Sequence, residues 1–293
     1  MESLSDALRA KHSRNGKDNR AVSIDKALAA LSARKVPEID GYLLSPVSSL
    51  PSKIADLLQL GIRRSIDLTE SAIREMNRES LNSSCMLARG VLETACLLVD
   101  LAIKARKAVQ APDAADLVAL NTFVANMLLG SGPKAKTFYF IEGHTVQNII
   151  SIIERVDKEL PKVFSQEGVE AEKFVLGGSY EGLSEHAHPN AHGMALTYAT
   201  RHGACVTTFT DANQQRVDVS LSLAISALST SLEMEVLALD FWDNDRVEFS
   251  VLAERKLHEA GTWPAHIPYP IPRRSDGSLP TAIRNGSSDT PTE

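Results

Sequence analysis

Cysteine is scarce in this chain, with three residues in 293, and no two of them form a CxxC pair. An odd number leaves one thiol unpaired under any pairing. Cys85 and Cys96 fall on one expected helix about 16 Å apart, at about 1.5 Å per residue, so they do not bridge each other. The sequence therefore excludes a disulfide framework and favours a cytoplasmic location with reduced thiols.

The chain also lacks a long apolar run and an excess of positive charge. Its longest uncharged apolar-leaning stretch, Val219 to Leu232, is too short to span a bilayer and contains five serines and one threonine. No apolar segment of a signal peptide follows the basic N-terminal residues, so we expect neither secretion nor membrane binding. Because the net charge is −6, RNA is compatible as a partner but not favoured.

Several catalytic signatures are missing as well. The sequence contains neither a Walker-type phosphate loop nor a dinucleotide fingerprint, and Gly177-Gly178 alone does not define one. A serine nucleophile such as Ser184 lacks the glycine-rich elbow and oxyanion arrangement of hydrolases. We therefore set aside nucleotide-dependent enzymes and serine hydrolases, and we expect no cofactor.

Helical periodicity is abundant, and 43% hydrophobic residues are enough to fill a sizeable core. Apolar residues recur at three- and four-residue steps from Ser52 to Ser80, which predicts a long amphipathic helix. The next segment, to about Val109, is more apolar and should be central in the fold. A last long helix, rich in small residues, is expected from Leu221 to about His258.

One interruption of this pattern predicts a short β-hairpin near residues 204–219. Cys205 to Thr210 is rich in β-branched and aromatic residues, and Asp211-Ala212-Asn213 is typical of a turn. Val217 to Val219 would then form the second strand. We therefore expect a mainly α fold, a multi-helix bundle with this one hairpin.

We divide the chain into a single helical domain with two flexible ends. Residues 1–20 are polar and basic, as in a mobile arm that aids solubility. Residues 21–260 form the domain, and residues 261–293 have the proline-, serine- and glycine-rich composition of an extended tail. The sequence does not fix the oligomeric state, and a homo-oligomer is compatible with it.

Residues suited to chemistry gather in the stretch from Tyr180 to Asn190. At helical spacing, Tyr180, Ser184 and His188 lie on one face, each four residues after the last. Pro189 disfavours helical geometry in the residue before it, so the helix should bend or stop near His188.

A second polar face lies on the expected central helix. Arg89 and Glu93 are one turn apart, and Asp100 follows Glu93 on the same face. The Arg–Glu pair is either a solvated stripe that supports the helix by about 0.2–0.5 kcal/mol, or part of a polar centre with the residues around His188.

A metal site is the first chemistry that this stretch suggests. Glu185-x-x-His188 has the i, i+3 spacing of di-iron carboxylate bundles, but such bundles need a second copy and the chain has none. A mononuclear site with His186 and His192 is also disfavoured, because His186 should face roughly 160° away from His188 at about 3.6 residues per turn. We therefore expect no native metal.

Acid–base chemistry and a structural role both stay open. A histidine that titrates near neutrality beside Glu185, Tyr180 and Arg89 could transfer protons. Alternatively, His188 holds helices together through hydrogen bonds and fixes the chain reversal that follows. An enzyme needs Arg89 and His188 in one solvent-open cavity, whereas a structural network should be sealed and fully hydrogen-bonded.

These residues resemble a motif of mostly bacterial helical proteins without an assigned activity. The motif reads Tyr-x-x-Leu-Ser-Glu-x-x-His-Pro-Asn, with an Arg-x-x-x-Glu helix earlier in the chain. The matching positions are Tyr180, Leu183, Ser184, Glu185, His188, Pro189 and Asn190, with Arg89 and Glu93. The resemblance covers residues 52 to 240, roughly, and implies a family rather than an activity.

A looser similarity is to the HEPN (higher eukaryotes and prokaryotes nucleotide-binding) helical bundles, many of which are RNA-cleaving toxins or defence proteins. Their mark is an Arg followed by a polar residue and then a His on the same helix. Here Arg201-His202 and Arg255-x-x-His258 have a different spacing. A ribonuclease of this kind would need Arg89 and His188 to rebuild the pair from two helices.

The preferred hypothesis is a cytoplasmic helical module, regulatory or defence-related, that binds a small polar ligand or a protein partner in a polar pocket. Its candidate ligand-binding residues are Arg89, Tyr180, Ser184, His188 and Asn190. The alternative is a HEPN-like, metal-independent ribonuclease, in which Arg89 stabilises the phosphorane-like charge. Its candidate catalytic residues are His188, Arg89, Glu93, Glu185 and Tyr180. A third hypothesis is a structural interaction protein, in which these groups form a buried polar network.

Overall fold

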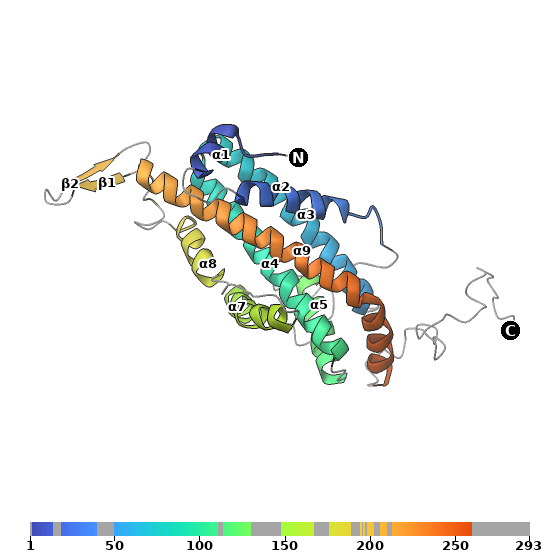
Figure 1. Cartoon of the computed structure of the whole chain (residues 1–293). Coiled ribbons are helices and arrows are strands. Elements are labelled where there is room, and N and C mark those ends of the chain that lie inside the picture. Colours follow the sequence, from blue (N-terminus) through green and yellow to red (C-terminus); the bar gives the residue numbers. More distant parts are fainter. Residues whose placement is uncertain are drawn as a thin grey trace.

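The computed structural model describes residues 2–13, 19–39, 50–110, 114–129, 148–166, 176–188, 194, 196, 198–201, 206–209 and 213–259. Within these residues the protein is a mainly α, multi-helix bundle with one two-stranded antiparallel sheet, as the sequence predicts (Figure 1). The proline-rich segment 261–293 lies outside the described residues, and its expected flexibility stays a prediction.

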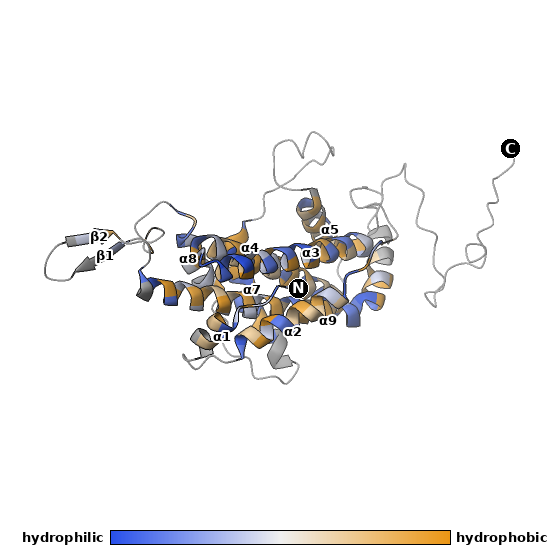
Figure 2. Ribbon diagram, turned by 90° about the horizontal axis from the view of Figure 1, so that it is seen from above, coloured by the Kyte–Doolittle hydropathy of each residue, from blue (hydrophilic) through white to orange (hydrophobic). Residues whose placement is uncertain are grey.

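Three long helices, α3, α4 and α9, form the centre of the bundle. The helices, in chain order, are α1 (Asp6–Ser13), α2 (Arg20–Ala33), α3 (Leu50–Asn77), α4 (Leu81–Gln110), α5 (Ala114–Leu129), α7 (Ile149–Gln166), α8 (Leu176–Glu185) and α9 (Gln214–Glu259). Hydrophobic and hydrophilic residues occupy different sides of the long helices (Figure 2). α4 is buried over most of its surface, as its apolar sequence predicts.

α4 and α9 run in the same direction, and α3 runs against both (Figure 1). Near the starts of α4 and α9, the Sγ of Cys85 lies 3.8 Å from the backbone oxygen of Ser220. α3 approaches α4 so closely that a Cβ added to Gly61 would lie 2.6 Å from Leu98 Cδ1. Glycine at this position therefore lets the two helices pack.

The two described cysteines, Cys85 and Cys96, are free thiols in the buried core of α4. Burial raises the pKa of Cys85 to about 12, and it also raises the pKa of Cys96. A thiol that stays protonated is a poor nucleophile, so these two residues serve to fill the core. Cys205 lies outside the described residues.

The last helix, α9, is long and apolar enough over Arg216–Ala253 to cross a membrane, judged by length and composition alone. However, 61% of its most apolar window is buried inside the bundle. A central core helix has the same character, because its apolar faces pack against several neighbours at once.

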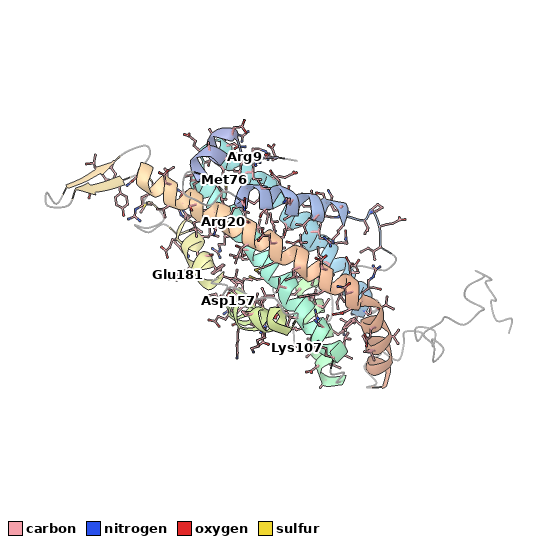
Figure 3. All side chains as sticks on the ribbon, viewed as in Figure 1. Arg9, Arg20, Met76, Lys107, Asp157 and Glu181 are labelled. Atoms are coloured by element: carbon pink, nitrogen blue, oxygen red, sulfur yellow. The ribbon has the colours of Figure 1, made fainter. Side chains whose placement is uncertain are left out.

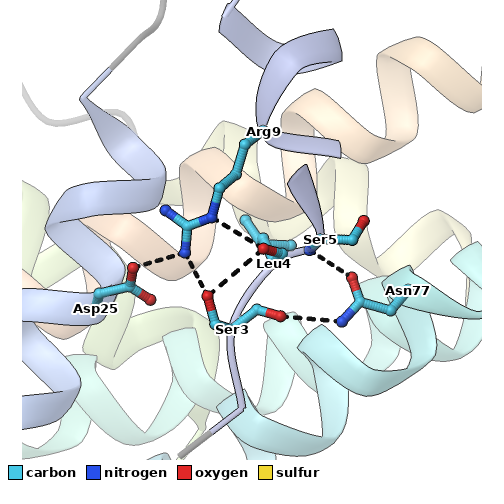
Figure 4. Close-up of polar contacts among 6 residues, drawn as sticks. All are labelled: Ser3, Leu4, Ser5, Arg9, Asp25 and Asn77. Carbon is cyan, nitrogen blue, oxygen red and sulfur yellow. Dashed lines mark hydrogen bonds and ion pairs between the residues drawn. The ribbon is translucent and has the colours of Figure 1, made fainter. Parts of the chain in front are cut away.

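The N-terminal segment packs against the bundle (Figure 4). Leu4 is buried, and the backbone N–H of Ser5 donates to Asn77 Oδ1 of α3 at 2.9 Å. Arg9 of α1 forms an ion pair with Asp25 of α2, 2.6 Å from Nη2 to Oδ2. The basic composition of residues 1–20 favours a mobile arm, but a buried leucine and these polar contacts hold its described part in place.

Helices α7 and α8 lie along α4 on the side away from α1 and α2 (Figure 1). Asp100 of α4, buried at 1% exposure, accepts from Arg155 of α7 at Nε and Nη2, at 2.6 and 3.0 Å. It also forms an ion pair with Lys104 one turn later. Asp100 is therefore the polar anchor between α4 and α7.

The hairpin is present, but the predicted position near residues 204–219 is wrong. Strand β1 (Tyr198–Arg201) pairs antiparallel with β2 (Val206–Phe209), with Tyr198 opposite Phe209. The hairpin extends beyond the end of the bundle (Figure 1). The side chain of Phe209 is exposed. The segment predicted as the first strand thus supplies the second one.

Asn213 explains the error, because it begins α9 instead of closing a turn. Its Oδ1 accepts the backbone N–H of Arg216 at 3.4 Å, and its Nδ2 donates to the backbone oxygen of Tyr198 at 2.7 Å. Asparagine is typical of both turns and helix starts. Val217 to Val219, predicted as a strand, consequently lie within the first two turns of α9.

Candidate functional site

Helix α8 carries most of the motif residues and is positioned by Asp157 of α7. The two carboxylate oxygens of Asp157 accept the backbone N–H groups of Leu176 and Gly177, both at 3.0 Å. These bonds satisfy two of the free N–H groups at the start of α8 and place negative charge at the positive end of its dipole. Figure 3 labels Asp157 on α7 and Glu181 on the neighbouring α8.

The helix ends at Glu185, close to the predicted end near His188. Each of the next three residues donates its backbone N–H to the carbonyl three residues earlier, at 3.3, 2.9 and 3.3 Å. This tightening is common at helix ends. Pro189, and the candidates Asn190 and His192 after it, lie outside the described residues.

Arg89 of α4 connects the two polar groups that the sequence singles out. Its Nε donates to Glu93 Oε1 at 2.9 Å, and its Nη2 donates to Tyr180 Oη at 2.8 Å. The guanidinium carbon lies 4.8 Å from the centroid of the Tyr180 ring, within cation–π range. The Arg89 and Glu93 side chains are 27% and 29% exposed, so water still screens their charges.

A surface pocket of about 490 Å³ opens between α4, α7 and α8, and we call it the α8 pocket. Five predicted residues line it: Arg89, Tyr180, Ser184, Glu185 and His188. The rest of the lining is Ile150, Ile153, Glu154, Gly177 and Glu181. Because His188 is exposed and the pocket is open to solvent, these residues do not form a sealed network.

Among the predicted site residues that the structure describes, Glu93 is the one that does not line the α8 pocket. It lines a second pocket, of about 330 Å³, together with Arg64 and Thr94. The Arg89–Glu93 pair therefore forms the ridge between the two pockets. Glu93 balances the charge of Arg89 from outside the α8 pocket.

The α8 pocket holds more negative than positive charge. Glu154 comes from α7, and Glu181 and Glu185 come from α8. The permanent cation in this lining is Arg89, which is already paired with Glu93. The pocket should therefore attract cations and repel phosphate groups.

Ser184 has a local partner that limits its use toward a ligand. Its hydroxyl donates to the backbone oxygen of Tyr180, one turn earlier on α8, at 2.6 Å. Serine in helices commonly makes this bond. Ser184 can therefore accept a hydrogen bond in the pocket, but its own proton is engaged.

His186 has a different environment from His188, as its helical phase predicts. Its Nδ1 lies 2.8 Å from Asn82 Oδ1 of α4, and its Nε2 lies 3.3 Å from Ser220 Oγ of α9. Burial lowers the pKa of His186, and the nearby Glu185 partly opposes this effect. His186 thus connects α8 to α4 and α9, and the structural role considered for His188 fits this residue better.

Glu154, Ile150 and Ile153 of α7 are pocket residues that the sequence did not single out. The periodicity of α7 indicates an amphipathic helix, but periodicity does not say which helix its polar face borders. No local motif marks these residues. Among the described residues, no three histidine, cysteine, aspartate or glutamate side chains are grouped so as to hold a metal ion.

Comparisons with protein-family models, curated proteins and solved structures found no match for this chain. The motif resemblance and the HEPN similarity therefore stay predictions. Any function must be argued from the geometry and charge of the α8 pocket.

Proposed function

We propose that the protein is a binding module whose α8 pocket takes a small cationic ligand with an amine or guanidinium group. The observation that carries this proposal is the charge of the lining, with three glutamates around one arginine that is already ion-paired. A cation placed among these carboxylates gains Coulomb energy, whereas a phosphate group is repelled.

The shape and composition of the pocket support the same ligand class. A volume of about 490 Å³ lies in the range of small-molecule sites, which is about 300–1,000 Å³. Ile150 and Ile153 provide an apolar wall for an alkyl chain, and Tyr180 provides an aromatic edge. A basic side chain of a protein partner has the same chemistry, so a free amine and a partner's arginine are two sources of one ligand group.

Calorimetric titration of the full-length protein tests this proposal. Agmatine and putrescine represent a free ligand, and an acetylated tripeptide with a central arginine represents a partner side chain. We expect Glu154→Gln/Glu181→Gln to weaken amine binding on the order of tenfold, since each exposed ion pair contributes up to about 1 kcal/mol. Binding should also weaken as salt is raised from about 0.05 to 0.5 M.

The matched control is Asp67→Asn/Glu248→Gln, which removes two exposed carboxylates from α3 and α9, neither of which lines the pocket. This control has the same net charge as Glu154→Gln/Glu181→Gln, but it should bind amines as tightly as the wild type does. Equal loss in both variants, or tighter binding of inorganic phosphate than of agmatine, would contradict the proposal. Binding of the peptide alone would assign the pocket to a partner side chain.

A metal-independent ribonuclease is the second candidate, and one observation favours it. Arg89 and His188 line the same solvent-open pocket, which is the arrangement such an enzyme needs. Its test is RNA cleavage in EDTA by the wild type and by His188→Ala. A general acid or base accounts for about 10²–10⁴-fold in rate, so a real ribonuclease should lose at least 100-fold in this variant. We expect no cleavage above background from either protein, because the glutamates repel the RNA backbone.

A further inference from the structure

Four polar side chains are buried on α3 and α9, two helices that contact each other. Ser65 and Thr69 lie one turn apart on α3, and Ser231 and Glu235 lie one turn apart on α9. Each of the four is at most 1% exposed. None of them lines the α8 pocket, and no sequence motif marks them.

The register of the two helices places these side chains opposite one another. Leu58 of α3 and Trp242 of α9 line the same surface pocket, and the helices run antiparallel (Figure 1). Ser65 follows Leu58 by seven residues on α3, and Glu235 precedes Trp242 by seven residues on α9. The Ser65 hydroxyl lowers the pKa of Glu235, so the two side chains are neighbours, as this register requires. The facing pairs are thus Ser65 with Glu235 and, one turn further, Thr69 with Ser231.

The oxygen atoms of this cluster lack hydrogen-bond partners outside the cluster. The three hydroxyls and both carboxylate oxygens are buried, and the Ser65 hydroxyl that lowers the pKa of Glu235 is the one neighbour that acts on any of them within the part of the chain that the structure describes. Helical serine and threonine usually donate to the carbonyl one turn earlier, and these three do not. Five such oxygens in one interface require an occupant, because buried polar groups without partners are strongly unfavourable.

Glu235 also lacks a charge partner. Burial raises the pKa of Glu235 to about 8, and the opposing influence comes from the Ser65 hydroxyl. No described charged group on α2, α3, α4, α5 or α8, the helices packed against α9, contributes to this shift. The charge of an ionised Glu235 must therefore be balanced by something held within the cluster.

We propose that Ser65, Thr69, Ser231 and Glu235 form a buried binding site for a small monovalent cation of the sodium class. Carboxylate and hydroxyl oxygens suit a hard cation, and the cluster has no nitrogen or sulfur ligand for a transition metal. One carboxylate with three neutral hydroxyls balances a single positive charge. A divalent ion would leave an uncompensated charge in the core, which is unfavourable.

A proton competes with the cation for this site. Protonation of Glu235 also neutralises the carboxylate, and an ordered water molecule can then bond to the hydroxyls. Because the pKa of Glu235 is about 8, the proton dominates in acid and the cation gains access as the pH rises above that value. Cation binding should therefore be strongest near pH 9 and weak at pH 6.

Thermal unfolding of the full-length protein in matched salts tests the proposal. LiCl, NaCl, KCl and CsCl are compared at equal concentration, at pH 9 and at pH 6, so that ionic strength is constant. At pH 9 we expect a higher Tm in NaCl than in CsCl, with a rise of about 3 °C for each tenfold increase of NaCl above its Kd. At pH 6 the difference should disappear.

Two variants separate the cation site from general effects of salt. Glu235→Gln keeps the shape of the protonated side chain and should abolish the Na⁺–Cs⁺ difference. Ser231→Ala keeps the carboxylate and should reduce the difference. Asp67→Asn, which removes an exposed charge on α3, should leave it unchanged.

Equal Tm values in NaCl and CsCl at pH 9 would overturn the proposal. A Na⁺-specific rise that persists in Glu235→Gln would overturn it as well, because the ion would then bind elsewhere. A Tm that depends on pH only through Glu235, without discrimination among the four cations, would assign the cluster to a proton and water and reject the cation.

Discussion

Two carboxylates are buried to the same degree in this protein, yet their surroundings are opposite. Asp100, at 1% exposure, lies between α4 and α7 and holds the cationic side chains Arg155 and Lys104. Glu235, at 0% exposure, lies between α3 and α9 and has the neutral Ser65 hydroxyl as its polar neighbour, with no cationic group among the described residues acting on its pKa. One interface carries its own counter-charges, and the other must obtain one from solvent.

The difference shows that burial alone does not define what an acidic residue does. Asp100 fixes two neighbours in place, so its negative charge is part of the fold. Glu235 has no such partner, so its charge state depends on pH and on small cations. A buried carboxylate with partners stabilises a contact between helices, whereas one without partners is a site that responds to its surroundings.

The largest expected effect is the pH dependence that Glu235 gives to stability. Its pKa is about 8 in the folded protein, against an ordinary value of 4.5. Between those values the folded state holds a proton that the unfolded chain lacks. The free energy of unfolding should therefore fall as pH rises, by up to about 1.4 kcal/mol per pH unit, or about 4 kcal/mol from pH 5 to pH 8.

Urea unfolding of the wild type and Glu235→Gln in CsCl, at several pH values, checks this expectation. The glutamine variant resembles the protonated acid, so its stability should match the wild type near pH 5 and exceed it at pH 8. Parallel curves for the two proteins would mean that Glu235 is paired or accessible to water.

A smaller loss is expected when the paired carboxylate is removed. Asp100→Ala leaves Arg155 and Lys104 without their partner and creates a gap between α4 and α7. Since these two side chains are 40% and 29% exposed, water can solvate them, and we expect a loss of about 2–3 kcal/mol, below the range for fully buried pairs.

Urea unfolding at pH 7 measures this loss, with Asp67→Ala as the exposed control on α3. The control should change stability by less than about 0.5 kcal/mol. An Asp100→Ala variant as stable as the control would show that Asp100 does not anchor α7.

His186 offers an intermediate case, a half-buried ionisable group whose hydrogen-bond partners are neutral. Its pKa is lowered by burial from the ordinary value of 6.5, so the unfolded chain binds a proton more readily than the folded one. Stability should therefore be full above pH 6.5 and decline as the pH falls below it. His186→Ala should cost about 1–2 kcal/mol at pH 7, because Asn82 and Ser220 lose their partner.

His188→Ala is the matched control for His186, since His188 is exposed two residues later. It should change the unfolding free energy by less than about 0.5 kcal/mol, measured by urea unfolding at pH 7 and at pH 5. Equal losses in both variants would contradict the assignment of separate roles to the two histidines.

The sequence predicts the parts of this protein that depend on local pattern. The three- and four-residue period of the long helices is visible in the printed chain, and so is the helical phase that separates His186 from His188. The same helical phase places Tyr180 and His188 on one face, and both residues line the α8 pocket. The hairpin was misplaced because Asn213 is equally suited to a turn and to a helix start.

Contacts between distant helices could not be predicted in this way. Glu154 enters the pocket only because Arg155 binds Asp100 and Asp157 caps α8, and neither contact leaves a local pattern. The Glu235 cluster depends on a register between α3 and α9, helices separated by more than 130 residues. Serine and glutamate in a small-residue helix are as compatible with a solvated face as with a buried one.

The smallest effect on stability is expected at the α8 pocket, where the charges are exposed and screened. Arg89→Met removes the bonds to Glu93 and Tyr180 but keeps much of the apolar stem, so the unfolding free energy should fall by at most about 1 kcal/mol. The affinity for amines should rise in this variant, although its stability falls. Without its arginine the pocket retains three glutamates, so agmatine should bind a few-fold more tightly.

Glu93→Gln is the matched variant, because it removes a negative charge that lies outside the α8 pocket. It leaves Arg89 uncompensated and should therefore weaken agmatine binding a few-fold. Calorimetry on both variants separates the two functions considered for this site. If Arg89 served to bind phosphate groups, Arg89→Met would abolish ligand binding, whereas a pocket for cations predicts that the two variants shift the affinity in opposite directions.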